Sequence, residues 1–271
     1  MEPGLLRDGL TLVVGLCAGV LSGAFGVGGA IVSTPGIRLL GVAPLVAVGT
    51  TLPAIIPSAL SGGSRYRAEG LLDWRAVLVV APLGLLTSVG GALASGLVPG
   101  EGHLLQLATA GLLGFSAWRM APRQPAPDRQ DDEGDRQGGG DVEHARAEPA
   151  WRLAAVGALA GSLSGLLGIG GGTVLVPGLH QVGGLSLRSS VATSLVCTAI
   201  FAVPGTVTHA LLGNVDWRVA LLLAVTVIPG ARLGAAASLR LGDRRLAGAV
   251  AAFLGVIAVI YGIGELVALV S

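Results

Sequence analysis

Lysine is absent from this 271-residue chain, in which all 17 basic residues are arginine. Charged residues make up only 12% of the sequence and aromatic residues only 4%. So few charges cannot supply the hydrated surface of a soluble domain. The net charge of +1 gives no reason to expect nucleic acid as a partner.

Cysteine is also scarce, with Cys17 and Cys197 the two in the chain. Both lie in apolar runs at unmatched positions, which favours small buried thiols over a disulfide or a metal ligand. The sequence contains no HExxH zinc motif and no G-x-S-x-G nucleophile elbow. We therefore expect a protein that is not an enzyme, with no catalytic residue, no cofactor and no metal site.

What the chain has in abundance is apolar residues, at 52% of the sequence, and 45 glycines. The mean hydropathy of +0.77 is typical of a polytopic α-helical membrane protein. Its tryptophans lie near the ends of the apolar runs, as interfacial anchors do. We expect an all-α, multi-pass protein of the plasma (inner) membrane, with the lipid bilayer as its surroundings.

One motif occurs twice, as GVLSGAFGVGGAIVSTPG from Gly19 and as GSLSGLLGIGGGTVLVPG from Gly161. Each copy lies inside an apolar run, at about Gly9 to Leu40 and about Leu153 to Gly183. Glycine clusters weaken a helix and proline breaks it. The motif therefore predicts a broken or re-entrant helix in each copy.

Unwound backbone at membrane depth is tolerated only where protein covers it or where it lines a polar cavity. Glycine permits a positive φ, so that successive amides can turn toward a bound anion, and the helix that follows adds its positive dipole end. The candidate substrate-binding glycines share this position in the two copies and are Gly26, Gly28, Gly29, Gly168, Gly170, Gly171 and Gly172. Glycines spaced four apart before each cluster favour close helix packing instead, as in Gly15, Gly19 and Gly23.

The likeness continues beyond the motif, because VGTTL at Val48 pairs with VATSL at Val191 and GLLDWR at Gly70 pairs with GNVDWR at Gly213. The chain is thus a tandem duplication, with one repeat at 1–120 and the other at 151–271. Between them, 121–150 is rich in charge, proline and glycine, which predicts a flexible polar cytoplasmic linker.

Hydroxyl groups follow the breaks at Thr50, Thr51, Thr193 and Ser194, where they suit an oxyanion. The alternative is that they bond to their own or a neighbouring helix. Arg232 lies within the apolar run 217–239, and an arginine at membrane depth suggests a functional group whose partner is an anion. The alternative for Arg232 is an exit toward the headgroups. We include all five residues in the candidate site.

Arginine also indicates the topology. If each motif run enters and leaves on one side, every repeat has three transmembrane helices and the repeats are inverted. Nine arginines outside the linker then lie on the cytoplasmic side with it, and three lie outside: Arg7, Arg38 and Arg218. If the motif runs cross fully, Arg240, Arg244 and Arg245 fall outside. The first arrangement obeys the positive-inside rule, and inverted repeats with broken helices are typical of secondary transporters.

At the glycine motif, VATSL and GNVDWR, the chain resembles the TauE/SafE family of sulfite exporters. In the first repeat Ala30 replaces the third glycine, so the halves are not equivalent. The resemblance implies a carrier that exports sulfite, a sulfonate or a related organic oxyanion. The glycine motif itself indicates that the anion binds at the paired breaks near the bilayer midplane. A channel-like or structural membrane protein, whose glycines only pack helices, is the alternative, and a homodimer remains open.

The topology makes a first prediction. Gly242 lies in the short loop between the last two apolar runs, flanked by Arg240 and Arg244. A cysteine placed there should not react with a membrane-impermeant thiol reagent in intact cells, and it should react after permeabilisation. The measurement is labelling in a background without Cys17 and Cys197. Labelling from outside intact cells would contradict the inverted arrangement.

Overall fold

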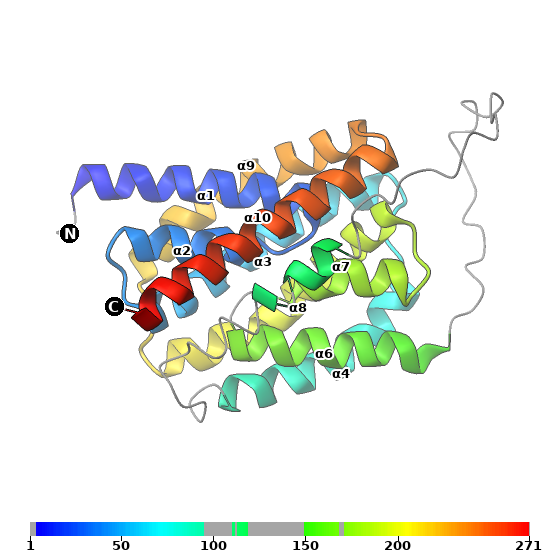
Figure 1. The fold of residues 1–271 in the computed structure, drawn as a ribbon, viewed down its shortest axis with the longest axis horizontal. Coiled ribbons are helices and arrows are strands. Elements are labelled where there is room, and N and C mark those ends of the chain that lie inside the picture. The colour runs from blue at the N-terminus through cyan, green and yellow to red at the C-terminus, as the bar shows by residue number, and fades with distance from the viewer. Residues whose placement is uncertain (1–3, 95–109, 112, 119–148, 168–170, 271) are drawn as a thin grey trace.

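The structure is a computed structural model that describes residues 4–94, 110–111, 113–118, 149–167 and 171–270. Within these ranges it contains helices and no strand. The helices are α1 (Leu5–Phe25), α2 (Ala30–Leu39), α3 (Pro44–Ala68), α4 (Trp74–Ala94), α6 (Ala150–Leu167), α7 (Gly172–Gln181), α8 (Leu187–Leu211), α9 (Trp217–Arg240) and α10 (Asp243–Val270). Most of them run along the long axis of the bundle (Figure 1).

Five helices of the described part, α1, α3, α4, α8 and α9, are long and apolar enough to cross a membrane. Large apolar side chains are exposed along them, including Leu78, Leu86 and Leu221. Exposed leucines on the outside of a bundle suit a hydrocarbon solvent. The prediction of an all-helical, multi-pass membrane protein is confirmed.

Each motif run forms a helical hairpin. Helix α2 turns back along α1, because a Cβ added at Gly29 would lie 3.3 Å from the Ala18 oxygen and one at Gly36 would lie 2.6 Å from Val14 Cγ1. Later residues of α2 thus contact earlier residues of α1, so the two helices are antiparallel.

The second motif run repeats this hairpin. A Cβ at Gly171 would lie 2.6 Å from the Ala160 oxygen, and one at Gly178 would lie 2.6 Å from Val156 Cγ1. Helix α7 therefore runs back along α6. The linker at 121–150 lies outside the described residues except for its last two, so the domain boundaries remain a prediction.

The glycines spaced four apart bring each hairpin against a helix of the other repeat. Added Cβ atoms at Gly19 and Gly23 would lie 2.5 and 2.0 Å from the backbone oxygens of Val227 and Ala231 on α9. Equivalent contacts join α6 to α4, at Gly157 with Val80 and at Gly161 with Gly84. The prediction that these glycines pack helices closely is confirmed, and both pairs run parallel.

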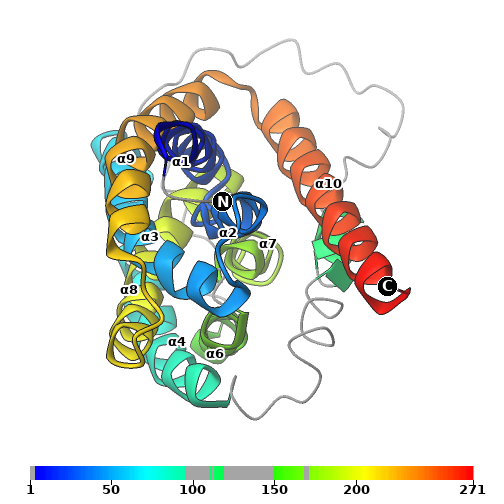
Figure 2. The same ribbon diagram turned by 90° about the vertical axis from the view of Figure 1, so that its left-hand side faces the viewer.

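The repeats also meet at the middle of the bundle, where α3 packs against α8. Gly62 faces Leu195 and Gly205 faces Leu52, with added Cβ atoms 3.3 and 3.1 Å from the leucine methyl carbons. Later residues of α3 thus contact earlier residues of α8, so these two helices, which occupy equivalent places in the repeats, are antiparallel. Seen along the bundle, α2 and α7 lie next to each other near its centre, and α10 lies to one side (Figure 2).

Candidate functional site

The first break is four residues long and buried. Helix α1 ends at Phe25. The next residue, Gly26, has a φ of 71°, and Gly28 and Gly29 have φ values of 85° and 71°. An L-residue with a side chain rarely adopts this conformation, so three such positions in four explain the glycine cluster. Helix α2 then begins at Ala30, whose N–H donates to the Gly28 oxygen at 2.8 Å.

The two breaks touch each other at the centre of the bundle. A Cβ added at Gly172, where α7 begins, would lie 2.5 Å from the Gly26 oxygen and 2.7 Å from Val27 Cα. The Ser194 hydroxyl of α8 lies 2.9 Å from the same Gly26 oxygen and donates to it. We call this contact region, formed by Gly26–Gly29, Gly171, Gly172 and Ser194, the break junction.

Backbone donors remain available there. Within the described residues, the N–H groups of Val27, Gly28 and Gly29 donate no hydrogen bond. All three residues are buried. The N-cap positions of α2 and α7 are Gly29 and Gly171, so no side chain caps either helix start with a hydrogen bond. Buried amides without acceptors are rare in proteins, and successive amides at a helix start form an anion-binding concavity.

Two serines add hydroxyls beside the starts of α2 and α7. A Cβ at Gly29 would lie 3.4 Å from Ser22 Cβ, and one at Gly171 would lie 3.3 Å from Ser164 Cβ. Ser22 is 0% exposed and Ser164 is 2% exposed. Neither hydroxyl has a hydrogen-bond partner in the part of the chain that the structure describes. They are thus donors that a ligand at the break junction can use.

Our sequence reasoning missed Ser22 and Ser164, although a signal was present. They occupy the same position of the two motif copies, in LSG before each glycine cluster. Two more buried hydroxyls have no partner in the described residues, that of Ser58 on α3 and that of Thr198 on α8.

The four predicted hydroxyl residues fall into two groups. Ser194 lies in the break junction, and Thr51 contacts α2 through the Thr34 hydroxyl, with 3.0 Å between the oxygens. Thr50 and Thr193 instead accept hydrogen bonds from the backbone N–H groups of Asp216, at 2.9 Å, and Asp73, at 3.2 Å. Their oxygens hold the segments before α9 and α4.

Three predicted residues remain. Gly168 and Gly170 lie outside the described residues. Arg232 is exposed on α9, whereas its neighbours Ala231 and Ala235 are buried. The structure therefore does not bring Arg232 to the breaks, and a long arginine side chain on an outer face can reach the headgroups.

The described residues lack two kinds of acidic or metal-binding group. They include no group of three or more histidine, cysteine, aspartate or glutamate side chains that could hold a metal ion. No aspartate or glutamate among the described side chains is buried. The polar groups of the break junction are hydroxyls, amides and carbonyls.

Comparison with known proteins gives consistent matches. The profile of the family described as sulfite exporter TauE/SafE matches residues 11–261. The chain is 29% identical over 244 residues to the probable membrane transporter protein YunE of Bacillus subtilis, covering 84% of this chain and 87% of that one. It is 28% identical over 237 residues to a probable membrane transporter protein of Xylella fastidiosa, covering 84% and 82%. No solved structure matches it.

The close contact of the breaks predicts an unequal response to two Gly→Ala substitutions. Gly172→Ala should lower the free energy of unfolding by about 1–3 kcal/mol, because its methyl group overlaps the first break. Gly90→Ala on α4 is the matched control, since a Cβ there meets nothing within 4 Å. Thermal unfolding of the purified proteins in detergent measures both. Equal midpoints for the two variants would show that the breaks do not press together.

Proposed function

This chain belongs to the sulfite exporter TauE/SafE family of membrane transporters, and we propose that it exports small oxyanions, sulfite or a sulfonate, bound at the break junction. The observation that carries the proposal is the contact of the first helix break with the start of α7, where the amides of Val27, Gly28 and Gly29 and the hydroxyls of Ser22 and Ser164 have no partner in the described residues. Neutral donors suit an anion that must leave again, because they bind it without a fixed countercharge.

Each part of the proposed site has a role. The amides of Val27, Gly28 and Gly29 donate to the anion's oxygens, and α2 directs its positive dipole end toward the same place. The Ser22 and Ser164 hydroxyls complete the donor set from the two repeats. Ser194 holds the Gly26 oxygen at 2.9 Å, which keeps this acceptor bonded within the protein. Arg232 is left out of the site.

The proposal includes inverted repeats with re-entrant motif runs. Supporting it, α2 and α7 fold back on α1 and α6, and the equivalent helices α3 and α8 are antiparallel. A cavity between the ends of α3, α8 and α9 gathers Arg65, Arg188 and Arg240. Arginine-rich ends of transmembrane helices face the cytoplasm. We assign this end, named the arginine-rich end, to the cytoplasm.

The proposed transport needs no coupled proton. Moving a monovalent anion out of an inside-negative cell is already favourable by about 2.3 kcal/mol per 100 mV. A proton-coupled carrier uses a titratable group deep in the membrane. No described aspartate or glutamate is buried, and His209, which is buried, lies in the last turn of α8. The membrane potential is then a sufficient driving force.

We therefore predict that sulfite flux follows the membrane potential. Purified protein in liposomes, clamped with potassium and valinomycin, should release sulfite faster when the interior is negative and slower when the potential is reversed. Liposomes without protein give the background.

Flux that ignores the potential but follows an imposed pH gradient would refute this uniport. Absence of any sulfite or sulfonate flux would favour the alternative, in which the glycines of the breaks serve helix packing only.

A further inference from the structure

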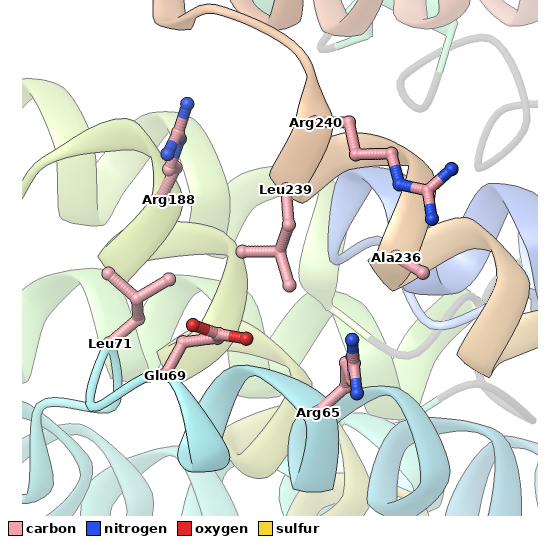
Figure 3. Close-up of a pocket in the computed structure, with 7 residues that line it drawn as sticks. All are labelled: Arg65, Glu69, Leu71, Arg188, Ala236, Leu239 and Arg240. Carbon is pink, nitrogen blue, oxygen red and sulfur yellow. The ribbon is translucent and has the colours of Figure 1, made fainter. Parts of the chain in front are cut away.

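A cavity of about 380 Å³ opens at the arginine-rich end, away from the break junction. The ends of α3 and α9 and the start of α8 surround it, and Arg65, Glu69, Arg188 and Arg240 supply its charges (Figure 3). Three arginines against one glutamate leave a net positive lining. A positive concave surface raises the local concentration of anions.

The arginines differ in what they already bind. Arg188 donates to the Leu241 oxygen at 2.7 Å and pairs with Asp243 at 2.8 Å. Within the described residues, the side chains of Arg65, Arg240 and Glu69 make no ion pair or hydrogen bond. Two guanidinium groups are thus available to a ligand, and a single carboxylate opposes it.

Tyr66 connects the end of α3 that lines the cavity with helix α1. Tyr66, next to Arg65 in α3, is 0% exposed and donates from its hydroxyl to the Gly23 oxygen at 2.9 Å. It also bonds to Ser238 of α9. Gly23 precedes the first break by three residues. Tyr66 therefore ties the end of α3 that carries Arg65 to the last turn of α1, which leads into the break.

From this arrangement we infer that the cavity is a cytoplasmic vestibule, in which Arg65 and Arg240 bind the oxyanion before it reaches the break junction. The inference rests on the proposed function and adds a second anion site to it. The guanidinium groups collect the anion from the cytoplasm, whereas the neutral donors of the junction carry it across. Glu69 opposes binding and speeds release from the vestibule.

The test compares three neutralised variants by their initial rates of sulfite uptake. Inside-out membrane vesicles present the cytoplasmic face to added sulfite, and right-side-out vesicles present the other face. Arg65→Gln should raise the half-saturating sulfite concentration about two- to fivefold from the cytoplasmic face, in line with an exposed charge contact. Glu69→Gln should lower it, and from the other face neither variant should change it.

Arg67→Gln is the matched control. It removes the same charge from the same end of α3, but Arg67 lies over the Trp74 ring at 5.7 Å and does not line the cavity. It should leave the half-saturating concentration unchanged. A change equal to that of Arg65→Gln would show a general surface-charge effect and overturn the vestibule.

The remaining outcomes separate the two claims. Sulfite flux with unchanged half-saturation in Arg65→Gln and Glu69→Gln would overturn the vestibule alone, whereas no sulfite flux in the unmodified protein would overturn it together with the proposed function. The Arg65→Gln effect should persist in liposomes of phosphatidylcholine alone. If it requires phosphatidylglycerol, a lipid phosphate occupies the cavity and the vestibule is wrong.

Discussion

The cost of bare backbone groups inside a membrane governs this structure. An amide or carbonyl without a partner in hydrocarbon costs several kcal/mol, so a helix broken at membrane depth must be covered by protein. The hairpins meet this constraint by placing the first break and the start of α7 together inside the bundle, where Gly172 lies close to Gly26 and Ser194 donates to the Gly26 oxygen. Such contact requires helices that approach to backbone distance, which the glycines of α1 and α6 permit. The amides of Val27, Gly28 and Gly29 stay without a protein acceptor in the described structure, and an anion is the ligand that such groups bind.

Much of this arrangement could be predicted from the sequence, because glycine and proline act locally. The end of α1 before Gly26 follows from the glycine cluster, and close packing of another helix on α1 follows from Gly19 and Gly23, although the sequence did not identify α9 as that helix. The helix starts at Trp74 and Trp217 were also predictable. Asp73 and Asp216 accept hydrogen bonds from Ala76 and Val219, at 2.9 and 3.1 Å, as capping residues do.

The rest depended on contacts between distant segments. Nothing local shows that Thr50 holds Asp216 and that Thr193 holds Asp73, whereas the adjacent Ser194 reaches the break. The sequence places Arg232 in an apolar run but does not show which way its side chain points. Only the packing of α9 places it on the outer face. The repeats have also diverged, since Thr34, which contacts Thr51, corresponds to Val176.

The central claim is that backbone amides of the break junction bind the transported anion. Hydrogen–deuterium exchange of the protein in nanodiscs, with and without saturating sulfite, measures these amides directly. Sulfite should slow exchange at Val27, Gly28 and Gly29 and leave the segment before α9, at Asn214, unchanged. If sulfite is transported but exchange at Val27–Gly29 stays the same, the anion is bound elsewhere and the account is wrong.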